Sequence, residues 1–102
     1  MNIKVINVIS SSLALSEKKC EKLYCKIVEL LMNGDNIVLD FYGIEKTIVA
    51  FFKASYGNLF LEFPDEFINE KIEFVNLHDI SKLQIDIAKK IVINKKRLLS
   101  LI

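Results

Sequence analysis

The sequence is poor in the residues that build metal sites, disulfide frameworks and phosphate-binding loops. It has 2 cysteines, 1 histidine, 1 proline and 3 glycines among 102 residues. Cys20 and Cys25 are five residues apart, which places them about 140° apart around a helix, so they are not expected to pair with each other. With a single histidine they do not supply the usual four ligands of zinc. The glycines lie far apart, which excludes a glycine-rich phosphate loop. We therefore predict neither a metal nor a cofactor.

An excess of charge of one sign and long hydrophobic runs are also lacking. The 14 Lys and Arg residues nearly balance the 13 Asp and Glu residues, so no overall field attracts the chain to nucleic acid or to an anionic membrane. The apolar N-terminal run is broken by Asn7 and by three serines from Ser10 onward. No stretch approaches the roughly twenty apolar residues of a membrane span. We expect a cytoplasmic protein, and we expect neither nucleic acid nor membrane as its partner.

Apolar side chains, in contrast, are abundant and make up 52% of the sequence. A chain of this length with that composition predicts one domain over residues 1–102. The β-branched run Ile3–Ile9 has too little polar alternation for a half-exposed strand, and it predicts a strand covered on both faces. The stretches Asn36–Tyr42 and Glu70–Leu77 predict two further strands.

Apolar residues at helical spacing predict one helix after each strand. The first begins after Ser16, and the second runs from about Ile48 to Phe60 with Thr47 as its N-cap. Asp79 is predicted to cap the third. Its inward face is assigned to Ile80, Leu83, Ile87 and Ile91, thickened by Ile85, Ala88 and Val92. This alternation predicts an α/β fold of order β-α-β-α-β-α, with a small, mainly parallel sheet packed with helices.

The middle of the chain carries a resemblance. The stretch "NIVLDFYGIEKTIVAFFKASYGNLFLEF", followed by "EKIEFVNL" and a closing helix, resembles the STAS-like domain family of unknown function, related to the anti-sigma-factor antagonists. The features that carry it are the strand end Leu39-Asp40-Phe41, then Gly43-Ile44, Phe51, and Tyr56-Gly57. The resemblance implies a STAS-like fold for the whole chain.

The same resemblance directs attention to the turn after the second strand. In anti-sigma-factor antagonists this turn carries an Asp-Ser-Ser-Gly-like sequence, and a kinase partner phosphorylates a serine there. Counted from Gly43, these positions fall on the stretch Ile48–Phe51, whose side chains cannot accept phosphate. Thr47 is the nearest hydroxyl, one position earlier. The resemblance therefore implies that the shape of the turn is kept and that the phosphorylation switch is lost.

Catalytic roles find little support in the same region. Asp40 could act as a base, but a carboxylate at a strand end beside Gly43 more often accepts hydrogen bonds from the amides of the turn. His78 precedes a helix start without a motif that supplies a cysteine or serine partner, so we expect it to be a surface residue. We therefore predict that the protein is not an enzyme.

Two apolar surfaces are candidates for binding a partner. Lys53 is the only charged residue from Ile48 to Leu61, so the second helix has a further aromatic stripe, which either lies under the Phe63–Phe67 segment or is exposed. The C-terminal tail is apolar to its end and is expected to dock on its own domain or on another copy. The predicted partner-binding residues are Phe52, Lys53, Tyr56 and Phe60 of the stripe, Glu45, Lys46 and Thr47 of the turn, and Leu98, Leu99 and Ile102 of the tail.

Two functional hypotheses follow. The first is a non-catalytic protein-interaction module that regulates a partner by surface binding. The resemblance implies that the partner is a histidine-kinase-like ATPase or another regulatory protein. The alternative is a small phage or mobile-element protein that inhibits a host or defence complex, as anti-CRISPR proteins do. In either case the uncovered apolar surfaces predict a homodimer.

Overall fold

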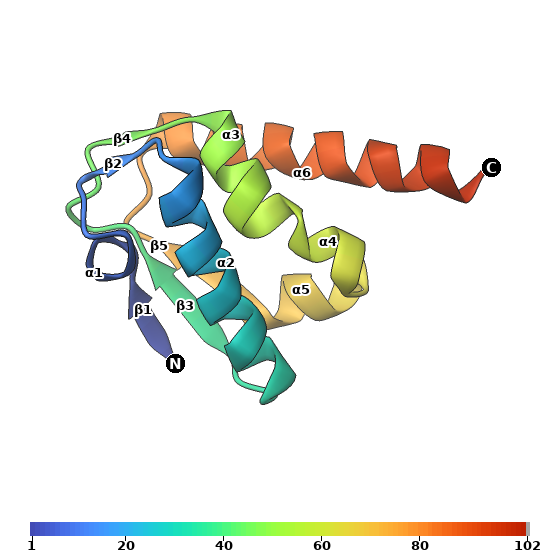
Figure 1. The fold of residues 1–102 in the computed structure, drawn as a ribbon, viewed down its shortest axis with the longest axis horizontal. Coiled ribbons are helices and arrows are strands. Elements are labelled where there is room, and N and C mark those ends of the chain that lie inside the picture. Colours follow the sequence, from blue (N-terminus) through green and yellow to red (C-terminus); the bar gives the residue numbers. More distant parts are fainter. Residues whose placement is uncertain (102) are drawn as a thin grey trace.

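The central sheet has three short parallel strands. The computed structural model describes residues 1–101, apart from the side chain of Glu17. Strands β1 (Asn2–Lys4), β3 (Ile37–Asp40) and β5 (Ile72–Val75) lie side by side in the order β1-β3-β5 (Figure 1). Helices connect them, as parallel pairing requires. The structure is thus a mixed α/β fold with a small parallel sheet, which confirms the predicted fold class.

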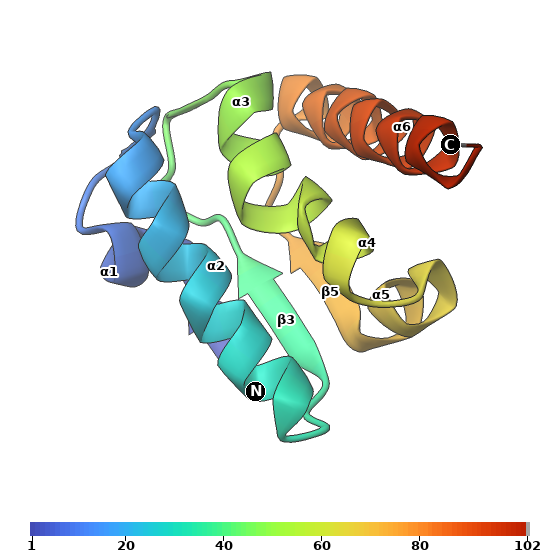
Figure 2. The ribbon, with the colours of Figure 1, turned by 45° about the vertical axis from the view of Figure 1, so that its right-hand side comes forward.

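Three long helical elements form the rest of the domain. They are α2 (Glu17–Met32), the α3–α4 run and α6 (Asp79–Ser100). The α3–α4 run consists of α3 (Val49–Phe52), the π-helical segment η1 (Lys53–Gly57) and α4 (Leu59–Glu62). It lies between α2 and α6 and packs on both (Figure 2). Because both flanks of this run are covered, most of its large apolar side chains are buried, with Leu61 as an exposed exception.

The first strand is much shorter than predicted. It ends at Lys4, and the next residues form a helical turn, α1 (Val5–Ile9). The reason lies in the partner strand, because Lys4 pairs with Asp40, the last residue of β3. Beyond that pair the backbone has no strand to bond to, and it satisfies its own hydrogen bonds as a helix. Val5 and Ile9, one turn apart, are both buried. The predicted strand Ile3–Ile9 is therefore wrong beyond Lys4.

Three further short elements were not predicted. Strands β2 (Leu13–Ala14) and β4 (Lys46–Thr47) pair in parallel and tie the serine-rich loop to the turn after β3. Helix α5 (Asp65–Lys71) follows Pro64, which stands at its N-cap position, and it buries Ile68. The acidic residues Asp65 and Glu66 that follow Pro64 suit the first turn of this helix.

The aromatic stripe of the α3–α4 run is buried. The fully or nearly fully buried residues of the run are Phe51, Ser55 and Leu59, and Phe52, Tyr56 and Phe60. These two series have a spacing of four residues, which drifts by about 40° per step on a regular α-helix. In the π-helical segment each hydrogen-bonded turn takes in one more residue, so the rotation per residue is smaller and both series stay inside.

The cover of this stripe comes from β5 and α6. The Tyr56 ring packs edge-on against Phe74 of β5, with 5.0 Å between the ring centroids. The Lys89 ammonium of α6 lies 5.2 Å from the centroid of the Phe60 ring. The alternative of an exposed aromatic patch formed by Phe52, Tyr56 and Phe60 is therefore wrong, because the sheet and the last helix enclose the run.

The inner face of α6 also differs from the prediction. The helix begins at Asp79, with His78 at its N-cap, and it buries Ser81, Ile85, Ala88 and Val92. The predicted inward residues Ile80, Leu83, Ile87 and Ile91 are exposed. Close packing on η1 explains the choice, because a Cβ on Gly57 would lie 3.1 Å from Val92 Cγ2 and 3.4 Å from the Ala88 carbonyl oxygen. Only small side chains on both helices allow this approach, so the bulkier face turns outward.

Candidate protein-binding site at the carboxyl edge of the sheet

The carboxyl ends of the three parallel strands lie at one edge of the sheet. This is the edge where open α/β sheets usually bind ligands. Two hollows of about 560 and 230 Å³ open there. The larger is lined by Phe41, Tyr42, Gly43, Ile44, Glu45, Asn76, Leu77 and His78, and the smaller by Glu45, Lys46, Thr47, His78, Ile80, Ser81 and Gln84. Both hollows share Glu45 and His78, so they form one continuous surface.

Asp40 organises the turns at this edge. One of its carboxylate oxygens, Oδ1, accepts a hydrogen bond from the Asn76 side-chain amide at 2.8 Å and another from the Tyr42 backbone amide at 2.9 Å. The bond from Asn76, followed by the one from Tyr42, lowers the pKa of Asp40. A carboxylate held in this way is a poor proton acceptor. The predicted structural role of Asp40 is confirmed.

Gly43 fixes the shape of the turn after β3. Its φ is 84°, in the left-handed region that favours glycine. A Cβ at this position would also lie 3.1 Å from Ile6 Cδ1. The Ile44 amide donates to the Phe41 carbonyl at 3.0 Å and closes the turn. Backbone conformation and close packing therefore both select glycine here.

Thr47 joins this turn to α6. Its hydroxyl lies 2.6 Å from Gln84 Oε1, an acceptor, and 2.8 Å from the Ser81 hydroxyl. Because the single Thr47 proton goes to Gln84, the Ser81 hydroxyl donates to Thr47. Gln84 Nε2 in turn donates to the Thr47 carbonyl at 3.1 Å. The prediction of Thr47 as an N-cap is wrong, because Ile48 stands at the N-cap position of α3 and the Thr47 side chain is turned to α6.

The segment that corresponds to the phosphorylated turn offers no free hydroxyl. From Gly43 to Phe51 the only hydroxyl is that of Thr47. Thr47 is 8% exposed, and its oxygen is engaged by two side chains of α6. A kinase could reach it only after this contact between the turn and α6 had opened. In the folded protein the hydroxyl of Thr47 is therefore shielded by α6.

The structure separates the predicted partner-binding residues into distant groups. Glu45 and Lys46 are exposed at the carboxyl edge, where Thr47 lies buried beneath them. Phe52, Tyr56 and Phe60 lie in the core and Lys53 is exposed on η1. Leu98 and Leu99 are exposed near the end of α6, far along the helix from the carboxyl edge (Figure 1). Ile102 lies outside the described residues. Only the turn residues therefore belong to one surface.

Sequence reasoning missed two exposed residues of the site, Tyr42 and Ile80. Tyr42 is 73% exposed on the larger hollow, directly after the buried Phe41. Ile80, exposed at the start of α6, lines the smaller hollow. The sequence contained a signal for Tyr42. Consecutive side chains of an extended chain point to opposite sides, so the residue after the buried Phe41 is expected to face outward. His78 is exposed, as predicted.

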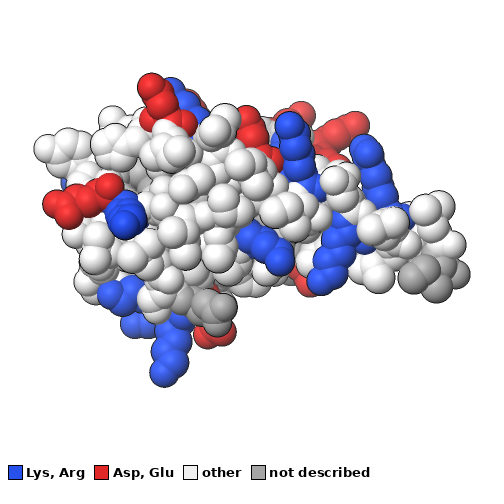
Figure 3. Space-filling model, turned by 90° about the horizontal axis from the view of Figure 1, so that it is seen from above, with Lys and Arg blue, Asp and Glu red and all other residues white. Residues whose placement is uncertain are grey.

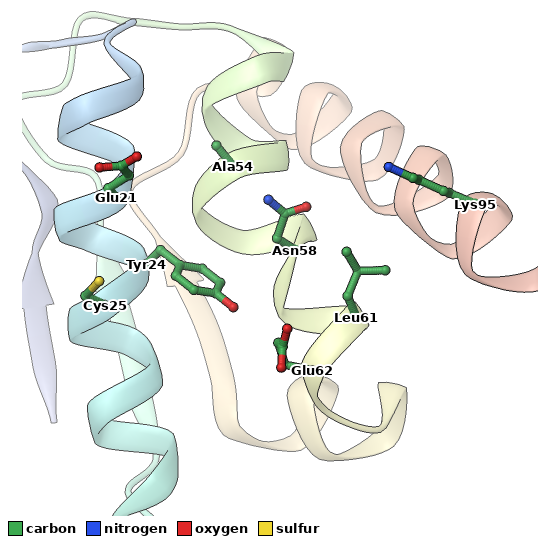
Figure 4. Close-up of a pocket in the computed structure, with 8 residues that line it drawn as sticks. All are labelled: Glu21, Tyr24, Cys25, Ala54, Asn58, Leu61, Glu62 and Lys95. Carbon is green, nitrogen blue, oxygen red and sulfur yellow. The ribbon is translucent and has the colours of Figure 1, made fainter. Parts of the chain in front are cut away.

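A second cavity, of about 610 Å³, lies between α2 and the α3–α4 run (Figure 4). Tyr24 projects from α2 into it, toward Glu62 of α4. Burial, followed by the charge of Glu62, raises the pKa of Tyr24. The phenol therefore stays protonated and can donate a hydrogen bond. Glu21 and the exposed Cys25 also line this space, so the cavity offers polar contacts to a ligand.

Among residues 1–101, leaving Glu17 aside, no three His, Cys, Asp or Glu side chains come close enough together to hold a metal ion. Every helix in the same residues is too short or too polar to cross a lipid bilayer.

Comparison with protein families matches residues 20–82 to the STAS-like domain of unknown function (DUF4325). The matched segment runs from the first turn of α2 through β3, the α3–α4 run and β5 to the start of α6. It therefore includes both turns of the carboxyl edge. No curated protein and no solved structure matches the chain.

Proposed function

This chain belongs to the family of STAS-like domains of unknown function, and from that premise we propose that it is a non-catalytic protein-interaction module. It regulates a partner protein by binding it through the carboxyl edge of the sheet, in the cytoplasm. By the resemblance to anti-sigma-factor antagonists, the partner is a histidine-kinase-like ATPase or another regulatory protein. Phosphorylation of this turn plays no part in the control.

One observation carries the proposal: Asp40 and Thr47, the polar side chains beneath this edge, are both used to hold its shape. Asp40 bonds to its own turn and to Asn76, and Thr47 bonds to Ser81 and Gln84. Groups held in this way do not accept or transfer protons readily, but they keep the surface above them rigid. A rigid surface binds with a smaller loss of conformational entropy than a flexible one.

The side chains above this frame suit a protein interface. Tyr42 offers a large exposed ring with a polar end, and tyrosine is enriched among the residues that dominate binding energy. Glu45 and Lys46 supply one charge of each sign beside it. Such a pair selects the orientation of a partner more than it adds to affinity. Exposed Ile80 extends the apolar part of the surface.

The test is affinity capture with matched variants. The full chain is immobilised, extract of the source organism is passed over it, and the retained proteins are identified by mass spectrometry. We expect a near-stoichiometric partner that the double variant Tyr42→Ala, Glu45→Lys no longer retains. Lys18→Glu, an exposed charge reversal on α2, is the control and should retain it. Circular dichroism confirms that each variant is folded.

The outcomes separate the hypotheses. Capture of the same proteins by the wild type and by the Tyr42, Glu45 double variant would refute the carboxyl edge as the binding surface. A host defence complex as the retained partner would support the alternative of an inhibitor in place of a regulator. Turnover of a small molecule that is lost in an edge variant would refute the non-catalytic assignment.

A further inference from the structure

The outward side of α6 carries a regular pattern whose apolar members the domain leaves exposed, although its Gln84 is partly buried and hydrogen-bonded to Thr47. The residues of this pattern are separated alternately by four and by three positions. This spacing is typical of helices that pack side by side along their length. We name this set the outer seam: Ile80, Gln84, Ile87, Ile91, Asn94 and Leu98. The apolar members are between 43% and 65% exposed. The helix is therefore amphipathic toward its own core and has a second apolar stripe outside.

The order of apolar and polar residues in the outer seam is the same whether it is followed from the N-terminal or from the C-terminal end of α6. From either end it has the order apolar, polar, apolar, apolar, polar, apolar, and its spacings are symmetric as well. The centre of this symmetry lies at the level of Lys89. A stripe of this kind is complementary to an antiparallel copy of itself, because each apolar layer then meets an apolar layer and each polar layer a polar one. Ile80 of one copy meets Leu98 of the other, and Ile87 meets Ile91.

Charges beside the seam follow the same symmetry. Asp79 and Asp86 lie along one flank, which also carries Lys90 and Arg97. In the antiparallel register centred on Lys89, Asp86 of one copy comes within two residues of the level of Lys90 in the other, about 3 Å along the axis. Asp79 and Arg97 are related in the same way. The two-fold axis therefore generates two Asp86–Lys90 pairs and two Asp79–Arg97 pairs of opposite charge between the copies.

The shape of the molecule leaves this helix accessible. With 22 residues α6 is about 33 Å long, and its C-terminal part projects from the body of the domain (Figure 1). From above, Lys and Arg side chains gather toward that projecting end (Figure 3). The buried residues Ala88 and Val92 lie roughly 80–120° around the helix from the seam and hold that other side of the helix against Gly57 of η1. A second helix can therefore pack along the outer seam without displacing the core.

We propose that a second copy of this chain occupies the outer seam, as a two-fold symmetric dimer with antiparallel α6 helices. Two-fold pairs are the commonest soluble oligomers, and they require a self-complementary surface of this kind. A single pair of helices is a small interface, so the dimer is expected to dissociate in the micromolar range. The register also brings Leu98 of one copy beside Ile80, at the carboxyl edge of the other. This inference does not depend on the proposed function.

The dimer is tested by sedimentation equilibrium on the full chain from a few to several hundred micromolar. We expect a monomer–dimer equilibrium. Ile87→Glu, at the centre of the seam, should raise the dissociation constant by about tenfold or more, because it places a charge in each copy's apolar layer. Leu15→Glu is the matched control, since Leu15 is 40% exposed against 43% for Ile87 and lies before α2. It should leave the equilibrium unchanged.

A charge exchange tests the antiparallel register. Asp86→Lys and Lys90→Asp should each weaken the dimer by at least about twofold, because each places like charges across the axis. The double exchange should restore the wild-type constant, and 0.5 M NaCl should reduce the differences shown by the two single variants. Circular dichroism verifies the helix content of every variant.

Three results would overturn the proposal. They are a monomer at several hundred micromolar, a dimer that tolerates Ile87→Glu, or a double exchange that is no better than the single ones. The first would leave the outer seam to a different protein, the second would move the interface elsewhere, and the third would exclude this register. A supported dimer and a failed capture experiment at Tyr42 are independent results.

Discussion

Replacing Thr47 with valine tests how the turn after β3 is held to α6. Valine has nearly the shape of threonine, so the substitution removes the hydroxyl and keeps the packing. The Ser81 hydroxyl loses its acceptor, and the Gln84 carbonyl loses a donor at 2.6 Å. Ser81 is 3% exposed and has little access to water, whereas Gln84 is only partly buried.

The expected loss follows from these contacts. A buried polar group without a partner lowers the free energy of unfolding by about 1–3 kcal/mol. The contribution of Gln84 should lie at the low end of this range, because its side chain can turn to water. We therefore expect the free energy of unfolding to fall by about 2 kcal/mol for Thr47→Val. For a domain of this size the melting temperature should fall by about 8–16 °C. Thr47→Ser keeps the hydroxyl, loses one methyl group and should cost about 0.8 kcal/mol.

Urea unfolding followed by far-UV circular dichroism measures both variants, and a double-mutant cycle with Ser81→Ala identifies the contact. If the two hydroxyls act on each other, the cycle should give a coupling of about 0.5–3 kcal/mol. Helix capping by Thr47 would predict independent losses, since Ser81 takes no part in a cap of α3. Additive losses, or a change below about 0.5 kcal/mol for Thr47→Val, would refute the bridge between turn and helix.

Three further expectations concern the turn, the core and a buried phenol. Incubation with cell extract and ATP should leave the Gly43–Phe51 segment unmodified, and stoichiometric phosphate on Thr47 would contradict this. Ile27→Ala and Phe51→Ala, both at fully buried positions, should each lower the free energy of unfolding by about 2–5 kcal/mol in urea; two losses below about 0.5 kcal/mol would mean that these faces are not packed. Burial, followed by the charge of Asp86, raises the pKa of Tyr56 to about 12. The folded state therefore keeps a proton that the unfolded state begins to lose near the ordinary pKa of about 10, so stability should decline as pH rises from 10 to 12. Tyr56→Phe should show a smaller decline, and equal slopes for the two proteins would count against the shift.

The order of strands and main helices could be predicted from the sequence because each segment carries its own periodicity. The helix from Glu17 to Met32 and the strand from Ile37 to Asp40 have the apolar spacing that their burial requires. The end of β1 could not be found in this way. It depends on where β3 ends, which is a property of a segment more than thirty residues away. The β-branched residues after Lys4 favour a strand locally, but they form a helical turn because no partner strand is available to them.

The faces of the helices were harder to predict than the helices themselves. On α6 both sides are apolar, and hydrophobicity alone favoured the side with the larger residues, Ile80 and Leu83. The close approach of Gly57 reverses this choice, because the lack of a side chain there lets Ala88 and Val92 pack directly against η1. In the site, the role of Asp40 was predictable, since an acid just before a glycine turn commonly accepts hydrogen bonds from the amides of that turn. The role of Thr47 depends on Gln84, whose position beside it is set by the packing of α6.

The π-helical segment has a consequence for the way relatives of this protein are aligned. A π turn contains one residue more than the α turn that it replaces, so residues 53–57 have the form of a one-residue insertion within an older, regular helix. A relative with a regular helix here would lack that residue, and an alignment drawn without a gap would pair core positions after Gly57 with surface positions. Phe60 would then be compared with a solvent-facing residue. Variation at this one site could thus make homologous cores look unrelated, and alignments of the family should be inspected for a gap between Lys53 and Gly57.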